Sequence, residues 1–461
     1  MLLLCCITAC NDWLEVAPQA EKEEAEMFEK EVGFRNVLIG AYIRMKSNNL
    51  YGEDLTYGSI EMLAQHWTNT DDLGKYLKAY NYEQSVVETK INSFYGNLYK
   101  VIADVNGLLN NIDARKEMFE GNNFEIIKGE ALAIRAFCHF DVLRLFGPIP
   151  TNLPEGTILP YVTTVSIVPN RLVSYNDFTT KLLADLDEAE RCLEGNDPIL
   201  TASIKELSTL EVAQDDNFLC DRQMRMNYYA VCALKARVQL WLGNKNEALK
   251  YAQKVIDAKD PNGNVMFRLG SATDCANDLI FSSEHIFNLN VYNLSDFKIS
   301  AANTFYTNST ALKYFWASET TDIRRGKMWK EVYDNYWWTY YYYMTKYTQA
   351  TNMPVWAKNS IPLFRLAEMY LIAMECGSIQ NANDLYKEVC IARDITPVTF
   401  GSTEELSETL ILEYNREFYG EGQAFYAYKR LGRSKIFGTS TVGSALIYVL
   451  PLPKAESLYI Q

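Results

Sequence analysis

The strongest constraint on the fold comes from two segments that each contain two short helical patterns joined at a glycine. They are residues 226–257, MNYYAVCALKARVQLWLGNKNEALKYAQKVID, and residues 363–394, LFRLAEMYLIAMECGSIQNANDLYKEVCIARD. Small residues stand where two helices must approach closely: Ala236, Gly243 and Ala248 in the first segment, and Gly377 and Ala382 in the second. Because a helical hairpin of this kind buries its apolar face only against neighbouring hairpins, we expect several of them to stack.

Three further segments repeat apolar residues at helical spacing, which extends this prediction toward the N-terminus. Their stripes are Leu98, Val101, Val105, Leu108 and Ile112; Ile127, Ala131, Ile134, Cys138, Val142 and Leu145; and Phe178, Leu182, Leu186, Ala189 and Leu193. The third stripe follows Ser174 and Asp177, a pair typical of a helix N-terminus. We therefore predict a mostly α fold, with a tetratricopeptide-like helical hairpin scaffold over about residues 31–260 and 361–430.

The residues between these two stretches predict a different kind of structure. Residues 262–310 mix Asn, Ser, Phe and Tyr with short apolar bursts, which is typical of long loops and a few short strands. Long insertions into a rigid scaffold are where binding usually resides. We expect residues of about 262–360 to form an irregular, loop-rich, ligand-facing part of one single body that spans residues 31–461.

Charge excludes one class of partner. The chain of 461 residues has a formal net charge of −14 and a pI of about 4.9. Phosphate backbones and anionic lipid surfaces repel such a molecule as a whole, so we predict no nucleic-acid partner. Hydrophobic residues make up 48% of the chain, which is ample material for a core.

Cysteine and histidine usage predicts neither a disulfide scaffold nor a bound metal or cofactor. The seven cysteines beyond the first ten residues are odd in number and contain no C-x-x-C pair. The three histidines, His66, His139 and His285, lie far apart and lack the spacing of metal ligands. We interpret the cysteines in helical apolar patterns as small hydrophobic residues.

The first ten residues, MLLLCCITAC, are apolar but too short to span a bilayer, which needs about 20 residues. Ile7 to Cys10 resemble a bacterial lipobox, in which cleavage precedes a cysteine whose thiol is lipidated. We expect residues 1–9 to be a signal-peptide remnant, Cys10 the lipidation site, and residues 10–30 the lipid anchor and tether. The alternative is a short hydrophobic N-terminus with ordinary cysteines, because no Lys or Arg precedes the apolar run.

Candidate ligand contacts are aromatic residues that neighbour polar residues in predicted loops. Sugar rings stack on Trp and Tyr, and their hydroxyls hydrogen-bond to Asn, Asp, Arg or Gln. The candidates are His66, Trp67, Asn69 and Asp71 in AQHWTNTDD, Asn290 and Tyr292 in NLNVYNLSDF, and Trp316 in YFWASE. For the aromatic candidates the alternative is packing in the core or anchoring of their own loop.

Residues 333–347, YDNYWWTYYYYMTKY, form the densest aromatic stretch. We predict a strand, in which alternate side chains point to opposite faces. Trp337, Thr339, Tyr341 and Tyr343 would then share one face, and Trp338, Tyr340 and Tyr342 the other. One set can pack against helices while the other meets solvent or ligand. Trp338 is our candidate for an exposed stacking residue, and packing of the whole stretch is the alternative.

Seven motifs in a fixed order carry a resemblance to a known family. They are the lipobox cysteine, DWLEVAP, RAFCHFDVLRLFGPIP, TTDIRRG, IPLFRLAEMYLIAMECG, NREFYGEGQAFYAYKR and VLPLPKAE. Together they resemble the SusD/RagB family of Bacteroidetes outer-membrane lipoproteins over essentially the whole chain. The resemblance implies a surface-exposed, lipid-anchored protein that binds an oligosaccharide, or in some members a peptide. It also implies a partner, a SusC-like TonB-dependent transporter barrel over which the lipoprotein closes as a lid.

One motif departs from the family pattern, which reads E-G-Q-R, two apolar or aromatic residues, then D. This sequence has Ala424 and Ala427 in place of the Arg and the Asp, so we interpret the motif as scaffold. A glycosidase would need two carboxylates across a sugar cleft. Glu417 and Glu421 lie one helical turn apart, but we interpret them as part of a solvated or ion-paired helix face. We predict that the protein is not an enzyme; a peptide-binding protein and a purely structural lid remain open alternatives.

Overall fold

The computed structural model describes residues 26–68, 71–166, 168–208, 217–292, 294, 305–317, 321–336, 338–353, 355–437 and 445–457. The predicted signal-peptide remnant, Cys10 and the tether up to residue 25 lie outside these described residues. Asn69 and Trp337 lie outside them as well. Most of the described chain is helical, which confirms the predicted fold class.

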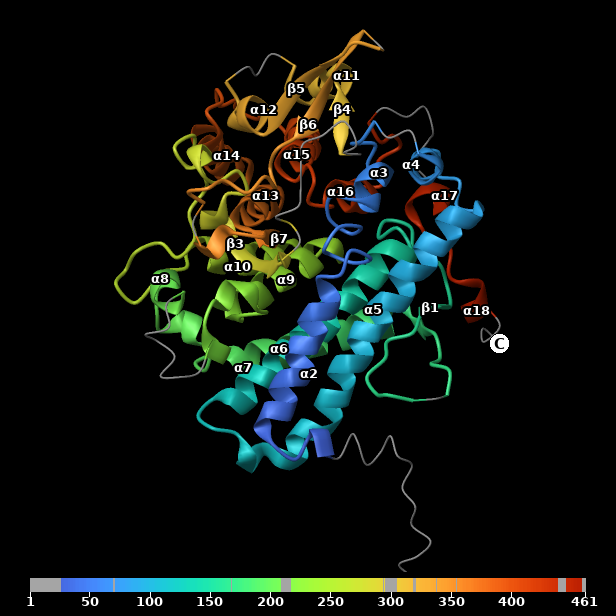
Figure 1. The fold of residues 1–461 in the computed structure, drawn as a ribbon, viewed down its shortest axis with the longest axis vertical. Helices are drawn as coiled ribbons and strands as arrows, with labels where there is room; N and C mark the ends of the chain where they lie inside the picture. Colours follow the sequence, from blue (N-terminus) through green and yellow to red (C-terminus); the bar gives the residue numbers. More distant parts are fainter. Residues whose placement is uncertain are drawn as a thin grey trace, which may run out of the picture.

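The longer helices are α2 (Glu31–Met45), α5 (Ser85–Ile112), α6 (Asn123–Phe146), α7 (Tyr175–Leu193), α9 (Tyr228–Trp241), α10 (Lys245–Ile256), α13 (Leu366–Cys376), α14 (Ile379–Arg393) and α15 (Thr403–Glu417). Shorter ones are α3 (Ser59–Leu63), α4 (Asp72–Lys78), α8 (Ile204–Leu207), α11 (Ser309–Trp316), α12 (Ile323–Lys327), α16 (Ala424–Arg430), α17 (Ala445–Tyr448) and α18 (Lys454–Ser457). In Figure 1, α2 and α5 run side by side along one end of the molecule, and α13 to α16 occupy the other end.

The two helical hairpins predicted from small residues are α9–α10 and α13–α14. The helices of each hairpin contact each other, and α10 also contacts α13, so the hairpins stack as expected. The side chains of Ala236, Ala248 and Ala382 are fully buried in these contacts. Gly243 turns the chain between α9 and α10 with φ 78°, a left-handed conformation that favours glycine.

The beginning and the buried face of α7 follow the predicted pattern. The Ser174 hydroxyl accepts a hydrogen bond from the Asp177 N–H at 3.1 Å and so caps the helix. The predicted stripe, Phe178, Leu182, Leu186, Ala189 and Leu193, is fully buried. Helix α6, which α7 packs against, is buried on nearly all sides and forms the centre of the helical layer.

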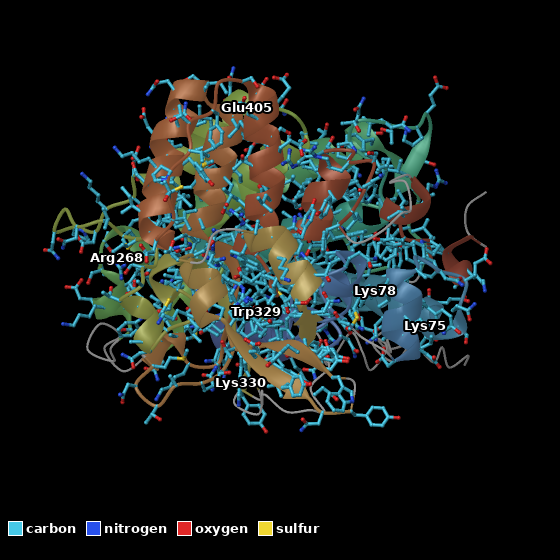
Figure 2. All side chains as sticks on the ribbon, turned by 90° about the horizontal axis from the view of Figure 1, so that it is seen from above. Lys75, Lys78, Arg268, Trp329, Lys330 and Glu405 are labelled. Atoms are coloured by element: carbon cyan, nitrogen blue, oxygen red, sulfur yellow. The ribbon has the colours of Figure 1, made fainter. Side chains whose placement is uncertain are left out.

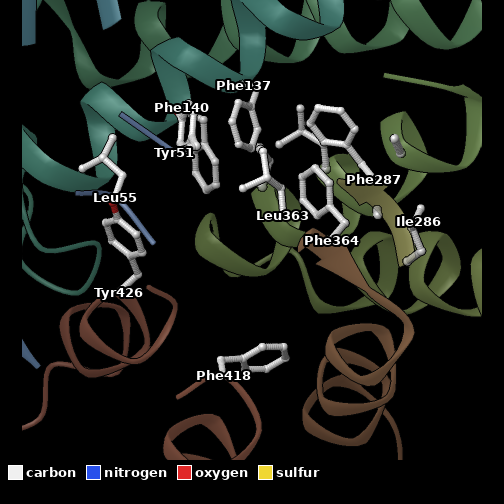
Figure 3. Packing of buried hydrophobic residues seen from close by; sticks show 14 of the residues in the cluster. Tyr51, Leu55, Phe137, Phe140, Ile286, Phe287, Leu363, Phe364, Phe418 and Tyr426 are labelled. Atoms are coloured by element: carbon white, nitrogen blue, oxygen red, sulfur yellow. The ribbon is translucent and has the colours of Figure 1, made fainter. Parts of the chain in front are cut away.

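The strands form three small sheets. They are β1 (Thr157–Leu159) with β2 (Val173–Ser174), β3 (His285–Asn290) with β7 (Ser360–Arg365), and β4 (Tyr306–Asn308), β6 (Thr339–Met344) and β5 (Trp329–Asp334) in that order. The β3–β7 pair lies in the core against α6, where Phe137 contacts Phe287 and Phe364 (Figure 3). The β5–β6 hairpin instead projects from one end of the molecule, beside α11 and α12 (Figure 1).

Candidate ligand-binding site

The β5–β6 hairpin carries most of the aromatic stretch that the sequence singled out. Its strands pair from Trp329 with Met344 to Asp334 with Thr339, so the described residues Asn335, Tyr336 and Trp338 belong to the tip. The predicted alternation of faces therefore holds from Thr339 onward. Trp338 does not belong to the strand, because it lies at the tip with a left-handed φ of 51°.

Exposure along β6 depends on distance from the helices more than on the face of the strand. Tyr340 near the tip is 48% exposed, Tyr342 is 9% exposed and Met344 at the base is 1% exposed. Tyr343, on the other face, is also buried. Both faces thus pack against the body at the base of the hairpin, and both emerge toward its tip.

One face of the hairpin presents aromatic rings to solvent next to the body. Tyr333 lies directly opposite Tyr340 in the β5–β6 register, and their ring centroids are 4.8 Å apart. Tyr342 follows Tyr340 by two residues, so its side chain leaves the strand on the same face. We refer to Tyr333, Tyr340 and Tyr342 as the hairpin face. The Tyr333 and Tyr340 rings are inclined by 53° to each other and both are exposed, so each offers a surface on which an apolar ring face of a ligand can stack, whereas Tyr342 is mostly buried at the base.

A pocket of about 320 Å³ opens beside the hairpin face, within the range usual for small ligands. We call it the hairpin pocket; its lining residues are Ser309, Leu312, Lys313, Trp316, Ala317, Arg325, Gly326 and Tyr342. Helix α11 supplies the residues up to Trp316, and α12 supplies Arg325. The Arg325 guanidinium carbon lies 5.2 Å from the centroid of the Tyr342 ring. Polar groups and an aromatic wall thus meet in one cavity.

Trp316, predicted as a ligand contact, forms the inner wall of this pocket but is only 2% exposed. Its indole N–H donates to Asp322 at 3.1 Å, and its ring packs against Trp329 with a centroid distance of 6.2 Å. Trp316 therefore packs mainly in the core, the alternative that the sequence left open, and it meets the pocket only as part of its lining.

Trp67 and His66 were also predicted as ligand contacts, and both are fully buried. The Trp67 indole N–H donates to the carbonyl of Tyr57 at 2.7 Å, and its ring contacts Phe305, Trp329 and Tyr419. The His66 ring stacks on Tyr419 with a centroid distance of 4.0 Å. A ring without exposed surface cannot stack on a sugar, so these two predictions are corrected: the pair anchors its own loop to the body.

The other predicted contacts lie apart from the hairpin. Asp71 is exposed and caps α4, since its carboxylate accepts from the Gly74 N–H at 2.7 Å. Asn290 donates to the Lys358 carbonyl at 3.1 Å and lines a separate cavity with Ile39 of α2. Tyr292 is 80% exposed, just beyond β3. Trp338, the predicted contact that lies at the hairpin tip, is 82% exposed.

Glu417 and Glu421, the carboxylates weighed as a catalytic pair, belong to a buried ion network. Glu417 accepts from Arg324 at 2.9 Å, from Arg365 at 2.8 Å and from Arg393 at 2.7 Å. Glu421 accepts from Lys346 and Arg365 at 2.6 and 2.8 Å. Burial alone would raise the pKa of the Glu417 carboxyl, but the three guanidinium groups hold that pKa well below its usual range. Both carboxylates are thus ion-paired and buried, but they do not share a helix face, because α15 ends at Glu417 and Glu421 lies in the turn before α16.

A larger cavity, of about 1420 Å³, lies away from the hairpin, between the start of α5, the loop after α6 and the segment before α18. The hydroxyl groups of its two tyrosines are occupied by the backbone: Tyr80 donates to Leu63 at 3.0 Å and Tyr82 to Ile447 at 2.5 Å. We prefer the hairpin pocket despite its smaller volume, because exposed aromatic rings and charged groups converge there.

The described part of the chain contains neither a metal-binding cluster nor a membrane-spanning helix. None of its clusters of His, Cys, Asp and Glu could hold a metal ion. None of its helices is both long and apolar enough to cross a membrane.

Sequence reasoning missed three residues of the site, Lys313, Arg325 and Tyr333. Tyr340 and Tyr342 were placed on a common face, but their exposure was left open. Tyr333 joins them only through the β5–β6 register, and Lys313 and Arg325 only through helices packed beside the sheet. A hairpin prediction over residues 329–344 was the available signal, since it would have paired Tyr333 with Tyr340.

Comparison with known proteins extends this description. A family model described as "Starch-binding associating with outer membrane" matches residues 12–191, and a model described as "SusD family" matches residues 297–445. The curated protein SusD-like protein P25 of Formosa agariphila is 29% identical over 156 residues, which are 32% of this chain. The chain spans 29% of the length of that relative.

Solved structures share the fold over almost the whole chain. A SusD superfamily protein from Bacteroides thetaiotaomicron is 20% identical, with a TM-score of 0.72 over 93% of this chain and 97% of that one. A SusD-like carbohydrate-binding protein from Bacteroides vulgatus is 18% identical, with a TM-score of 0.70 over 93% and 96%. A laminarin-binding SusD-like protein is 16% identical, with a TM-score of 0.64 over 93% and 97%.

Proposed function

The chain belongs to the SusD/RagB family, and we propose that it is a cell-surface lipoprotein that binds an oligosaccharide and delivers it to a SusC-like TonB-dependent transporter of the outer membrane. In this proposal Cys10 carries the lipid, residues up to about 30 form the tether, and the folded body meets the transporter at the cell surface. The description of one matching family as starch-binding and associated with the outer membrane supports both the cargo class and the location.

The observation that carries the proposal is the hairpin face beside its pocket. The Tyr333–Tyr340 pair offers an exposed aromatic surface, and Ser309, Lys313 and Arg325 supply hydrogen-bond donors within the adjoining cavity. Oligosaccharides present both an apolar ring face and many hydroxyl groups, so they match a site with these two parts. The similarity to a laminarin-binding protein supports the same class of cargo.

We propose binding without chemistry on the cargo. The two carboxylates, Glu417 at the end of α15 and Glu421 in the turn that follows, are engaged by Arg and Lys side chains in the interior, where a sugar has no access. A general acid and a nucleophile both need a free carboxyl group beside the glycosidic bond. The buried ion network therefore supports a structural role for this pair.

The proposal is tested by calorimetry with a panel of glycans, including laminarin, and with a matched panel of peptides. We expect a glycan to bind, and Tyr340→Ala to weaken that binding about tenfold. An aromatic contact contributes about 0.5–1.5 kcal/mol beyond its buried area, and 1.4 kcal/mol is a factor of ten.

The matched control is Lys330→Ala, which changes an exposed residue on the other face of the same hairpin. Figure 2 shows Lys330 at the outer side of the molecule and Trp329 nearer the helices. Lys330→Ala should leave the affinity for the glycan unchanged. Binding of peptides without binding of any glycan would refute the proposal and favour the peptide-binding alternative.

A further inference from the structure

The hairpin pocket has a local charge opposite to that of the whole protein. Its described lining contains Lys313 of α11 and Arg325 of α12 but no Asp or Glu. The chain as a whole has a formal net charge of −14. A site that only recognised neutral sugar hydroxyls would be expected to combine donors with carboxylate or amide acceptors. This pocket instead concentrates positively charged donors. One carboxylate, that of Glu331, lies opposite Tyr342 in the β5–β6 register and interacts with the Tyr342 hydroxyl, so two positive charges face one negative charge here.

Both positive charges are uncommitted within the described part of the chain. No carboxylate there forms an ion pair with Lys313 or Arg325, and Arg325 contacts the Tyr342 ring instead. The neighbouring Arg324 shows the contrast, since its guanidinium is buried and paired with Asp322, Glu413 and Glu417. Adjacent arginines on α12 therefore differ: one serves the interior and the other faces a cavity.

We infer that the hairpin pocket binds the acidic group of an anionic oligosaccharide, a uronic acid carboxylate or a sulfate ester. This inference rests on the function proposed above and names its cargo class. The Arg325 guanidinium, positioned against Tyr342, suits two-point recognition of a planar or tetrahedral oxyanion. Lys313, exposed on α11, adds a flexible point charge at the same cavity.

The hairpin pocket, which would hold the acidic group, adjoins the hairpin face, on which a sugar ring would stack. Tyr342 belongs both to the hairpin pocket and to the hairpin face, and Tyr340 continues that face toward the tip. An acidic sugar in the pocket would thus place the next sugar of the chain over the Tyr333–Tyr340 pair.

Lys313 and Arg325 act on an anion in the hairpin pocket more strongly than the net negative charge of the whole molecule does. Charges in contact interact by about 4 kcal/mol at the effective dielectric of a protein surface. Charges farther away than the Debye length, about 8 Å at physiological ionic strength, are largely screened. The net charge of −14 therefore slows the approach of an anion but does not cancel the two contacts within the pocket.

The test compares ligands that differ only in charge. Calorimetry on the full chain uses a galacturonic acid oligosaccharide against its methyl ester, and a sulfated galactan oligosaccharide against its desulfated form. We expect one charged member to bind at least tenfold more tightly than its neutral partner, and the pair that responds identifies carboxylate or sulfate. Lys313→Gln and Arg325→Gln should each weaken binding of the charged member about tenfold, and leave the neutral member unaffected.

Lys330→Gln is the matched control, because it removes one exposed positive charge on the other face of β5. It should leave both affinities unchanged, and a uniform loss in all three variants would overturn the inference in favour of a diffuse charge effect. If neutral and charged glycans bind equally, and Tyr340→Ala weakens both, the inference fails while the proposed function stands. If only peptides bind, both fail. Circular dichroism of each variant verifies that the fold is retained.

Discussion

At the scale of single residues, the Glu417 carboxylate is a buried charge that depends on several ion-pair partners. It accepts from three guanidinium groups, and it is 3% exposed. Two of those arginines also bind Glu284, which links the network to the start of β3. Such a cluster stabilises a protein only while its charges balance, since each buried ion carries a desolvation cost of several kcal/mol.

Glu417→Ala should therefore be strongly destabilising. The substitution leaves Arg324, Arg365 and Arg393 with less compensation in the interior, and loss of one partner of a buried ion pair typically costs about 3–5 kcal/mol. We expect the free energy of unfolding, measured by urea titration with circular dichroism detection, to fall by that amount.

The matched control is Glu247→Ala on α10, where the carboxylate pairs with Lys250 at 2.9 Å on the surface. Exposed ion pairs contribute about 0–1 kcal/mol, so this variant should be nearly as stable as the wild type. Equal stability losses for the two variants would contradict the view that burial gives the Glu417 network its importance.

Residue environments of this kind could not be predicted from the sequence. Trp67 looked like an exposed ligand contact because its neighbours are polar. Its burial depends on rings from Phe305, Trp329 and Tyr419, more than 230 residues further along the chain. Without an estimate of those long-range contacts, a Trp in a polar loop and a Trp that anchors one have the same local signature.

At the scale of elements, the β5–β6 hairpin behaves as an arm with a buried base and an exposed tip. Trp329 contacts Trp316 and Tyr419 at the base, whereas Tyr336 and Trp338 at the tip are 80% and 82% exposed. Most of the apolar surface that the hairpin buries therefore lies at its base. The tip can be changed with little effect on folding.

Replacement of residues 335–338 by Asn-Gly tests this division. A two-residue Asn-Gly turn closes a β-hairpin in the favoured geometry, and it would join Asp334 to Thr339 directly. We expect the melting temperature to stay within about 2 °C of the wild type. Affinity for the glycan should fall at least threefold, because the aromatic residues Tyr336, Trp337 and Trp338 are removed together.

The outcome decides whether the hairpin tip, which includes Trp338, contacts the ligand. Unchanged affinity would restrict the site to the hairpin face and pocket, whereas a large drop in melting temperature would show that the tip contributes to folding. Calorimetry and thermal denaturation on the same preparation separate these results.

Elements with strong local patterns could be predicted well. The α9–α10 and α13–α14 hairpins follow from small residues at fixed spacing, and the cap of α7 follows from Ser174. The alternation in β6 was also predicted. The gradient of exposure along β6 was not, because it arises from packing against α11 and β4, and neither partner is specified by the period of the strand.

At the scale of the whole molecule, the motifs that carry the family resemblance meet in the interior. Arg324 comes from TTDIRRG, Arg365 from IPLFRLAEMY, and Glu417 and Glu421 from NREFYGEGQ, and all four belong to the buried ion network. These motifs therefore build the scaffold. Of the site residues, Lys313, Tyr333 and Tyr340 lie outside these motifs, whereas Arg325 belongs to TTDIRRG, where it follows the buried Arg324.

Growth of a strain without the protein distinguishes a lipoprotein that contacts its cargo from one that only covers the transporter as a lid. We expect a strain without the protein to lose growth on the bound glycan, and full-length wild type to restore it. The Tyr340→Ala and Arg325→Gln double variant should restore at most about a tenth of the uptake rate, since each change weakens binding about tenfold. Lys330→Ala should restore it fully. Full rescue by the double variant, at wild-type abundance on the cell surface, would mean that the protein acts as a structural lid without touching its cargo.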